Sequence, residues 1–180
     1  MVFYNTEIPG LIVLEPKIWE DERGFFFEAF NQRMFNDIAP DVQFVQDNQA
    51  SSTYGVLRGL HYQVEPYAQA KLVRVLQGEV LDVVVDLRED SETYGHSYSL
   101  RLSAANKRQL FVPRGLAHGY VVLSDTAVFF YKVDNYYSKV HEGGICYNDP
   151  ALKIDWQLPP EDIIVADRDR EFPFFGNHRT

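Results

Sequence analysis

The stretch that decides the fold is KLVRVLQ (71–77), followed by Gly78-Glu79 and then by VLDVVVDL (80–87). Both apolar runs are rich in β-branched residues, which pack well on a pleated surface, and glycine between them is typical of a turn. We therefore predict two strands joined by a turn at Gly78-Glu79. Because side chains alternate along a strand, one face of the second run collects Leu81, Val83, Val85 and Leu87.

Similar short apolar segments, separated by turn residues, lie on both sides of this pair. The segments that we predict to be extended are 10–15, 25–30, 42–49, 57–63, 96–103, 108–112, 119–123 and 127–134. Helix is predicted only at 31–39, where apolar residues recur at helical spacing, and at 160–166, and the following DRDREFP is predicted to be irregular. Many short strands with little helix favour an all-β sandwich or jelly roll, in a single domain spanning 1–180.

Composition excludes several classes of partner and site. The chain has 180 residues and a formal net charge of −9, and no run of Lys or Arg suggests nucleic-acid binding. Its single cysteine, Cys146, excludes an intrachain disulfide and a cysteine-based zinc site, and fits a reduced, cytoplasmic location. The sequence contains no signal-peptide pattern and no apolar stretch long enough for a membrane span, so we expect no membrane partner.

Pro113, Gly115 and His118 form a PxGxxH pattern that resembles the second half-motif of cupins. In the half-motif of metal-binding cupins, two histidines lie two residues apart on one strand. The corresponding region here offers only His61 and then Lys71. An ammonium group is a poor ligand at neutral pH, so we predict that the protein binds no metal.

Four side chains together suggest proton chemistry. His61, Lys71, Tyr131 and Asp169 offer a base, a cation, an acid and an orienting carboxylate. Proton abstraction beside a carbonyl needs this set. An isolated histidine in a strand is more often a core residue, and spacing alone does not bring the four together, so the structural alternative stays open at this point.

The chain resembles the dTDP-4-dehydrorhamnose 3,5-epimerases in motifs that keep their order over nearly its whole length. These motifs are DERGFFFE (21–28), FVQDN (44–48), VLRGLHYQ (56–63), KLVRVLQGEVLDVVVDLR (71–88), NKRQLFVPRGLAHGY (106–120), FYKVDNYYS (130–138), EGGICYND (142–149) and DRDREFP (167–173). The resemblance implies a double-stranded β-helix jelly roll of cupin type with a few short peripheral helices. It also implies a cofactor-independent isomerase of dTDP-L-rhamnose biosynthesis. Such an enzyme inverts C3 and C5 of dTDP-4-dehydro-6-deoxy-D-glucose to give dTDP-4-dehydro-6-deoxy-L-mannose.

The resemblance also assigns roles. It implies that His61 is the base, with Asp169 as its partner, that Tyr131 donates a proton from the other face, and that Lys71 stabilises the enolate oxygen. It implies a homodimer that exchanges N-terminal strands, so that Arg23 and Glu28 serve the partner's pocket. The substrate-binding residues that it implies are Arg23, Glu28, Gln46, Asp47, Asn48, Arg58, Lys71, His118, Tyr137, Glu142 and Arg168.

Two other functions remain to be separated by experiment: a mono-epimerase that acts at C3 or C5 only, and a non-catalytic cupin that binds a sugar nucleotide. One local conflict also remains. Strict alternation places Arg58 and His61 on opposite faces of their strand, so both reach one ligand only if the strand is irregular. Gly59 between them predicts a bulge or kink.

Overall fold

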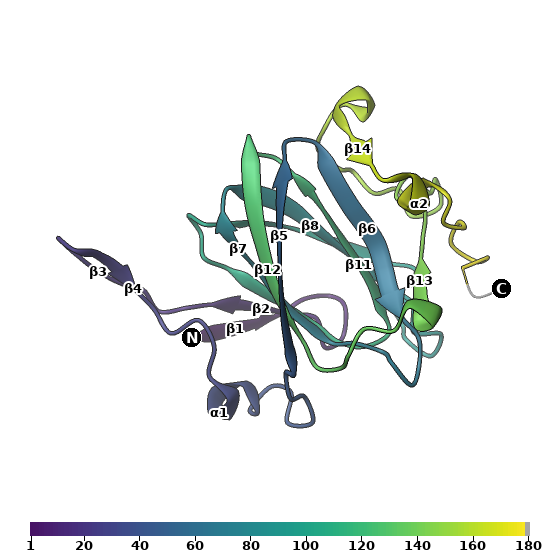
Figure 1. Ribbon diagram of the computed structural model, residues 1–180. Coiled ribbons are helices and arrows are strands. Elements are labelled where there is room, and N and C mark those ends of the chain that lie inside the picture. Colours follow the sequence, from purple (N-terminus) through teal and green to yellow (C-terminus); the bar gives the residue numbers. More distant parts are fainter. Residues whose placement is uncertain (179–180) are drawn as a thin grey trace.

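The computed structural model describes residues 1–178 and shows two packed β-sheets (Figure 1). The first sheet has the order β1-β2-β10-β7-β12-β5 and the second the order β13-β6-β11-β8-β9, with β14 paired to β6. This arrangement confirms the predicted all-β jelly roll.

The strands of the first sheet are β1 (Val2–Asn5), β2 (Ile12–Glu15), β5 (Gln46–Thr53), β7 (Lys71–Gln77), β10 (Gln109–Val112) and β12 (Thr126–Val133). Those of the second sheet are β6 (Val56–Gln63), β8 (Glu79–Asp86), β9 (Ser97–Ser103), β11 (Leu116–Val122), β13 (Glu142–Gly144) and β14 (Ile164–Val165). Most predicted extended segments overlap these strands, whereas β1, β13 and β14 were not predicted.

The connection between β7 and β8 differs from a simple turn between paired strands. Only Gly78, at a φ of 77°, separates them, and Glu79 already belongs to β8. β7 pairs with β10 and β12, whereas β8 pairs with β9 and β11, so the chain crosses here from one sheet to the other. A glycine fits because positive φ carries no penalty there, and a side chain would collide with the Thr126 carbonyl.

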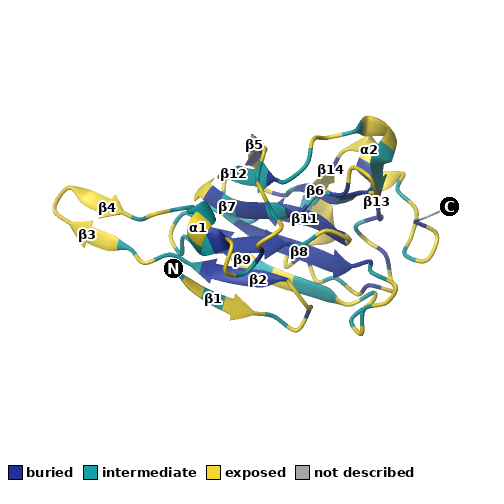
Figure 2. Ribbon diagram, turned by 90° about the horizontal axis from the view of Figure 1, so that it is seen from below, coloured by how far each residue is buried: buried dark blue, intermediate teal, exposed yellow. Residues whose placement is uncertain are grey.

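Strand β8 is buried on both faces (Figure 2). Val80 and Val84 pack between the sheets, with Val73 and Val75 of β7. The opposite face is covered by the chain that follows β13, and that second cluster includes Leu81, Val83, Val85, Leu87, Ile145, Leu152, Trp156 and Val165. Double-sided burial explains why the run reads as continuously apolar, and it makes β8 a rigid base for side chains aimed into the sandwich.

The helical predictions were partly wrong. The 31–39 segment forms only α1 (Gln32–Phe35), and 160–166 forms a 3₁₀ turn, Pro160–Asp162, followed by β14. The stretch predicted as irregular contains α2 (Asp167–Arg170), whose charged sequence has no apolar periodicity and which is held by tertiary contacts. A second 3₁₀ turn is Lys139–His141. No helix within residues 1–178 has the length and apolar character to span a membrane.

A two-stranded arm projects from the sandwich (Figures 1 and 2). It consists of β3 (Trp19–Asp21) and β4 (Gly24–Phe26), which pair only with each other. Its aromatic side chains are uncovered: Trp19 is 51%, Phe25 58% and Phe26 70% exposed. Such a concentration of exposed aromatic surface is typical of a contact with another molecule.

Candidate active site

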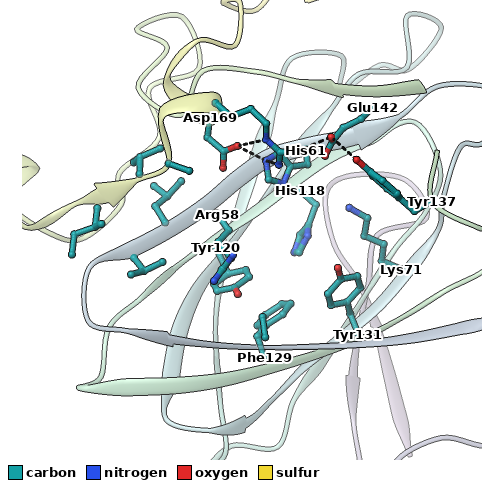
Figure 3. A pocket seen from close by; sticks show the side chains of 17 residues that line it. Arg58, His61, Lys71, His118, Tyr120, Phe129, Tyr131, Tyr137, Glu142 and Asp169 are labelled. Atoms are coloured by element: carbon teal, nitrogen blue, oxygen red, sulfur yellow. Dashed lines mark hydrogen bonds and ion pairs between the residues drawn. The ribbon is translucent and has the colours of Figure 1, made fainter. Parts of the chain in front are cut away.

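A pocket of about 670 Å³ opens between the two sheets (Figure 3). Strands β6 and β11 line one side and β7 and β12 the other, while the segment from β14 to α2 closes part of the rim. The predicted site residues that it brings together are Arg58, His61, Lys71, His118, Tyr131, Tyr137, Glu142, Arg168 and Asp169.

His61 is held by a buried carboxylate. Its Nε2 lies 2.9 Å from Asp169 Oδ1, and the Gly59 amide donates to Asp169 Oδ2 at 3.2 Å. Burial would raise the pKa of Asp169, but the hydrogen bonds from His61 and Gly59 and the charge of Arg168 lower it overall. The carboxylate is therefore ionised at neutral pH and fixes the orientation of the imidazole that it contacts.

A bulge in β6 turns two side chains toward the same pocket. His61 lies opposite His118, but Arg58 lies opposite Tyr120, so three steps along β6 match two along β11. Gly59 has a φ of 128°, and a Cβ there would lie 2.5 Å from the Gly119 Cα. This register shift confirms the irregularity predicted at Gly59, and it explains how Arg58 and His61 both line the pocket.

His118 contacts a second buried carboxylate, Asp82, whose charge also acts on Lys71. His118 Nε2 lies 2.8 Å from Oδ2 of Asp82, which is 0% exposed. Burial raises the pKa of Asp82, although His118 and Lys71 oppose the rise. Burial lowers the pKa of Lys71 to about 8, although the negative charges of Asp82 and Glu142 act to raise it. Lys71 is therefore still an ammonium at neutral pH, and it loses its charge more readily than an ordinary lysine.

Asp82 and Tyr120 were not among the predicted site residues. Asp82 carried a signal in the sequence, since it is a carboxylate inside the apolar run VLDVVVDL and shares a face with Val80 and Val84. Tyr120 follows the PxGxxH pattern by two residues, and its position in an apolar strand gave no such signal. Within residues 1–178, no group of three or more His, Cys, Asp or Glu side chains is placed to hold a metal ion.

Tyr131 faces the pocket from β12, in the sheet opposite to that of His61 (Figure 3). Burial raises its pKa, and so does the charge of Glu142, while Arg58 acts in the opposite direction. The phenol is therefore protonated at neutral pH and can act as a hydrogen-bond or proton donor. His61 and Tyr131 thus occupy opposite walls of the pocket.

Glu142 organises the mouth of the pocket. Its Oε2 accepts a hydrogen bond from Tyr137 Oη at 2.9 Å and one from Arg168 Nη1 at 3.0 Å. The Tyr137 side chain is 51% exposed, so it presents an aromatic surface beside the opening. An exposed ring at this position suits stacking on a flat ligand.

Arg58 differs from Arg168 in its partners. Arg168 contacts the carboxylates of Glu142 and Asp169, whereas Arg58 donates from Nε to Ser52 Oγ at 3.1 Å. Among the ion pairs of the described chain, none involves Arg58. A guanidinium that faces a cavity without a carboxylate is suited to bind an anionic ligand such as phosphate.

The remaining predicted residues lie away from this pocket in the single chain. Arg23, on the arm, pairs with Asp21, and Glu28 accepts from Asn31 Nδ2 at 3.1 Å. On β5, Gln46 donates to Asn48 at 2.9 Å, while Asp47 pairs with Lys132 at 2.8 Å. None of the five predicted residues Arg23, Glu28, Gln46, Asp47 and Asn48 is among those that line the pocket.

The chain is similar to known proteins over nearly its whole length. A family model described as dTDP-4-dehydrorhamnose 3,5-epimerase matches residues 5–177. The enzyme of that name from Shigella flexneri is 54% identical over 166 residues, which cover 92% of this chain and 91% of that protein. The crystal structure of the Elizabethkingia anophelis enzyme aligns with a TM-score of 0.94 and 51% identity, covering 97% of this chain and 96% of that one.

A crystal structure with a bound ligand is also similar. It is the dTDP-6-deoxy-D-glucose-3,5-epimerase from Legionella pneumophila in complex with dTDP-4-keto-L-rhamnose. Its TM-score is 0.92 at 46% identity, and the alignment covers 96% of this chain and 92% of that one.

Proposed function

The chain belongs to the dTDP-4-dehydrorhamnose 3,5-epimerase family, and from that premise we propose how its pocket inverts a dTDP-linked 4-keto sugar. The substrate is dTDP-4-dehydro-6-deoxy-D-glucose, and the product is dTDP-4-dehydro-6-deoxy-L-mannose. The observation that carries the proposal is the placement of His61 with Asp169 on one wall and Tyr131 on the other. Inversion at carbon requires a base and an acid on opposite sides of the sugar.

His61 removes the proton in the first half of the reaction. The C4 ketone acidifies the hydrogens at C3 and C5, so a neutral imidazole within reach is a sufficient base. When the C–H bond breaks, its electron pair moves into the carbonyl and leaves an enolate oxygen at C4. Asp169 stabilises the imidazolium that forms, and the Lys71 ammonium stabilises the enolate, with His118 as a second donor.

Tyr131 completes the inversion. Its O–H transfers a proton to the opposite face of the same carbon, and the electron pair of the enolate forms the new C–H bond. His61 then carries one extra proton and Tyr131 lacks one, so exchange with solvent resets both groups before the second carbon reacts. No electron leaves the sugar, and the proposed reaction therefore uses no redox cofactor.

The nucleotide occupies the outer part of the site. Arg58 and Arg168 bind the diphosphate, and Tyr137 stacks on the thymine. In the proposed homodimer, the arm of one protomer covers its exposed aromatic residues against the partner and brings Arg23 and Glu28 to the second pocket. Contacts of Gln46, Asp47 and Asn48 with the ligand, a single domain over 1–180 and a cytoplasmic location complete the proposal.

Deuterium exchange tests this function. The 4-keto sugar nucleotide is incubated with the protein in deuterium oxide, and NMR follows the label and the configuration at each carbon. Deuterium at both C3 and C5 with inversion is expected. Deuterium at one carbon only would identify a mono-epimerase. Deuterium at neither carbon would favour a non-catalytic protein that binds the sugar nucleotide.

His61→Ala isolates the base. We expect this variant to lose exchange at both carbons while it keeps affinity for dTDP, because His61 contacts the sugar end of the pocket. Unchanged exchange in His61→Ala would refute the assignment of the base even if the wild-type enzyme inverts both carbons.

A further inference from the structure

Tyr120 carries a polar group that the free protein does not use. It lies on β11, is 5% exposed and lines the pocket, where its ring stacks on Phe129 with centroids 4.0 Å apart and an interplanar angle of 14° (Figure 3). Its hydroxyl oxygen is buried and has no hydrogen-bond partner within the described chain. Such groups are rare because an unpaired buried hydroxyl destabilises the fold.

The immediate neighbours do not satisfy this hydroxyl. Burial raises the pKa of Tyr120, while the charge of Arg58 and the nearby Ser52 hydroxyl lower it. The Ser52 hydroxyl does not reach hydrogen-bond geometry with Tyr120, and its oxygen already accepts from Arg58 Nε at 3.1 Å. The stacking on Phe129 fixes the ring, and the charge of Arg58 acts on the Tyr120 hydroxyl in that position.

Arg58 indicates which ligand group this hydroxyl meets. Tyr120 and Arg58 are cross-strand partners of β11 and β6, so their side chains are neighbours on one wall. Arg58 has no carboxylate partner in the part of the chain that the structure describes, and both groups can donate hydrogen bonds. A corner of the pocket where, within residues 1–178, a guanidinium faces no carboxylate and a phenol has no hydrogen-bond partner is complementary to an anion that accepts several hydrogen bonds.

We propose that Tyr120 is a substrate-binding residue whose hydroxyl donates a hydrogen bond to a phosphate oxygen of the nucleotide, beside Arg58. The inference rests on the proposed function and adds a residue to its diphosphate subsite. Because the phosphate takes no part in the proton transfers, this hydrogen bond forms equally in the ground state and in the transition state. Its loss therefore raises KM and leaves kcat nearly unchanged.

Tyr120→Phe tests the contact, because it removes one oxygen atom and keeps the ring stack. We expect the Kd for dTDP to rise about tenfold or more, as for a hydrogen bond to a charged group. KM for the sugar nucleotide should rise with it, while affinity for thymidine, which has no phosphate, stays unchanged. The Tm of the free variant should equal or exceed that of the wild type, because an unpaired buried hydroxyl has been removed.

Tyr98→Phe is the matched control. Tyr98 packs against the same core cluster from β9 and lies outside the pocket, so its dTDP affinity and KM should match the wild type. Unchanged dTDP binding in Tyr120→Phe, or weaker binding of the sugar nucleotide alone, would overturn the phosphate contact. A lower Tm with intact dTDP binding would give the hydroxyl a structural role instead. A wild-type protein that binds no dTDP would refute the proposed function itself.

Discussion

Replacing Asp169 by Asn removes the negative charge beside the base and nearly preserves shape. The His61 Nε2 to Asp169 Oδ1 distance is 2.9 Å, and the two side chains are 24% and 4% exposed. Charge centres about 4 Å apart at an effective dielectric constant of about 20 attract each other by about 4 kcal/mol, which corresponds to about a thousandfold. Solvent access to His61 reduces this figure, so we expect kcat for exchange to fall by about a hundred- to a thousandfold.

The assay compares deuterium incorporation at C3 and C5 by NMR, together with dTDP affinity by calorimetry. Exchange at both carbons should slow to a similar extent, because one base serves both, and dTDP affinity should change little. Asp167→Asn is the control, since Asp167 is an exposed carboxylate of the same helix α2. A decrease of less than about fivefold in Asp169→Asn would show that the carboxylate contributes little to the imidazolium, contrary to the electrostatic argument.

Two further predictions concern pH. Lys71 has a pKa of about 8 and is proposed to act as an ammonium, so kcat/KM should decline above pH 8. The Lys71→Arg variant keeps its charge in this range and should not show the decline. A wild-type kcat/KM that stays constant above pH 8 would contradict this prediction. Asp86 is fully buried and accepts hydrogen bonds from Arg88, Ser91 and Thr93, which lower its pKa although burial opposes them. Asp86→Asn should therefore lower the free energy of unfolding at pH 7 by about 2 kcal/mol. Because the folded pKa is depressed, the difference should shrink as the pH falls below about 4, the value of an unfolded carboxyl; equal differences in urea titrations at pH 7 and pH 3 would refute the argument.

The sequence predicted where the strands lie better than it predicted which strands pair with each other. The runs 71–77 and 80–87 form β7 and β8, but alternation along a strand is the same whether two strands pair or belong to different sheets. The aromatic segment at 25–30 predicted a strand, and the structure places Phe25 and Phe26 on an arm where they stay 58% and 70% exposed. A pattern of apolar residues indicates burial but does not say against which molecule.

The residues of the pocket could be predicted where they lie in motifs that resemble those of the family. The positions of His61, Lys71, Tyr131 and Asp169 in one pocket follow from that resemblance, since they are far apart in the sequence. Tyr120 could not be identified, because the absence of a hydrogen-bond partner is a property of three-dimensional packing. Helix α2 was not predicted because it is held by tertiary contacts, such as that of Asp169 with the Gly59 amide, which the local sequence does not show.

The two-sheet frame has a stereochemical consequence. His61 belongs to β6 in one sheet and Tyr131 to β12 in the other, so removal and return of hydrogen are assigned to separate layers of the molecule. If the proton on His61 exchanges with solvent and His61 then returns a proton to the same face, the substrate acquires solvent label with its configuration retained. The ratio of label uptake to inversion therefore reports how often the proton returns from the layer of His61 and not from that of Tyr131. In the proposed mechanism, the handedness of the product therefore depends on how the two sheets pack against each other.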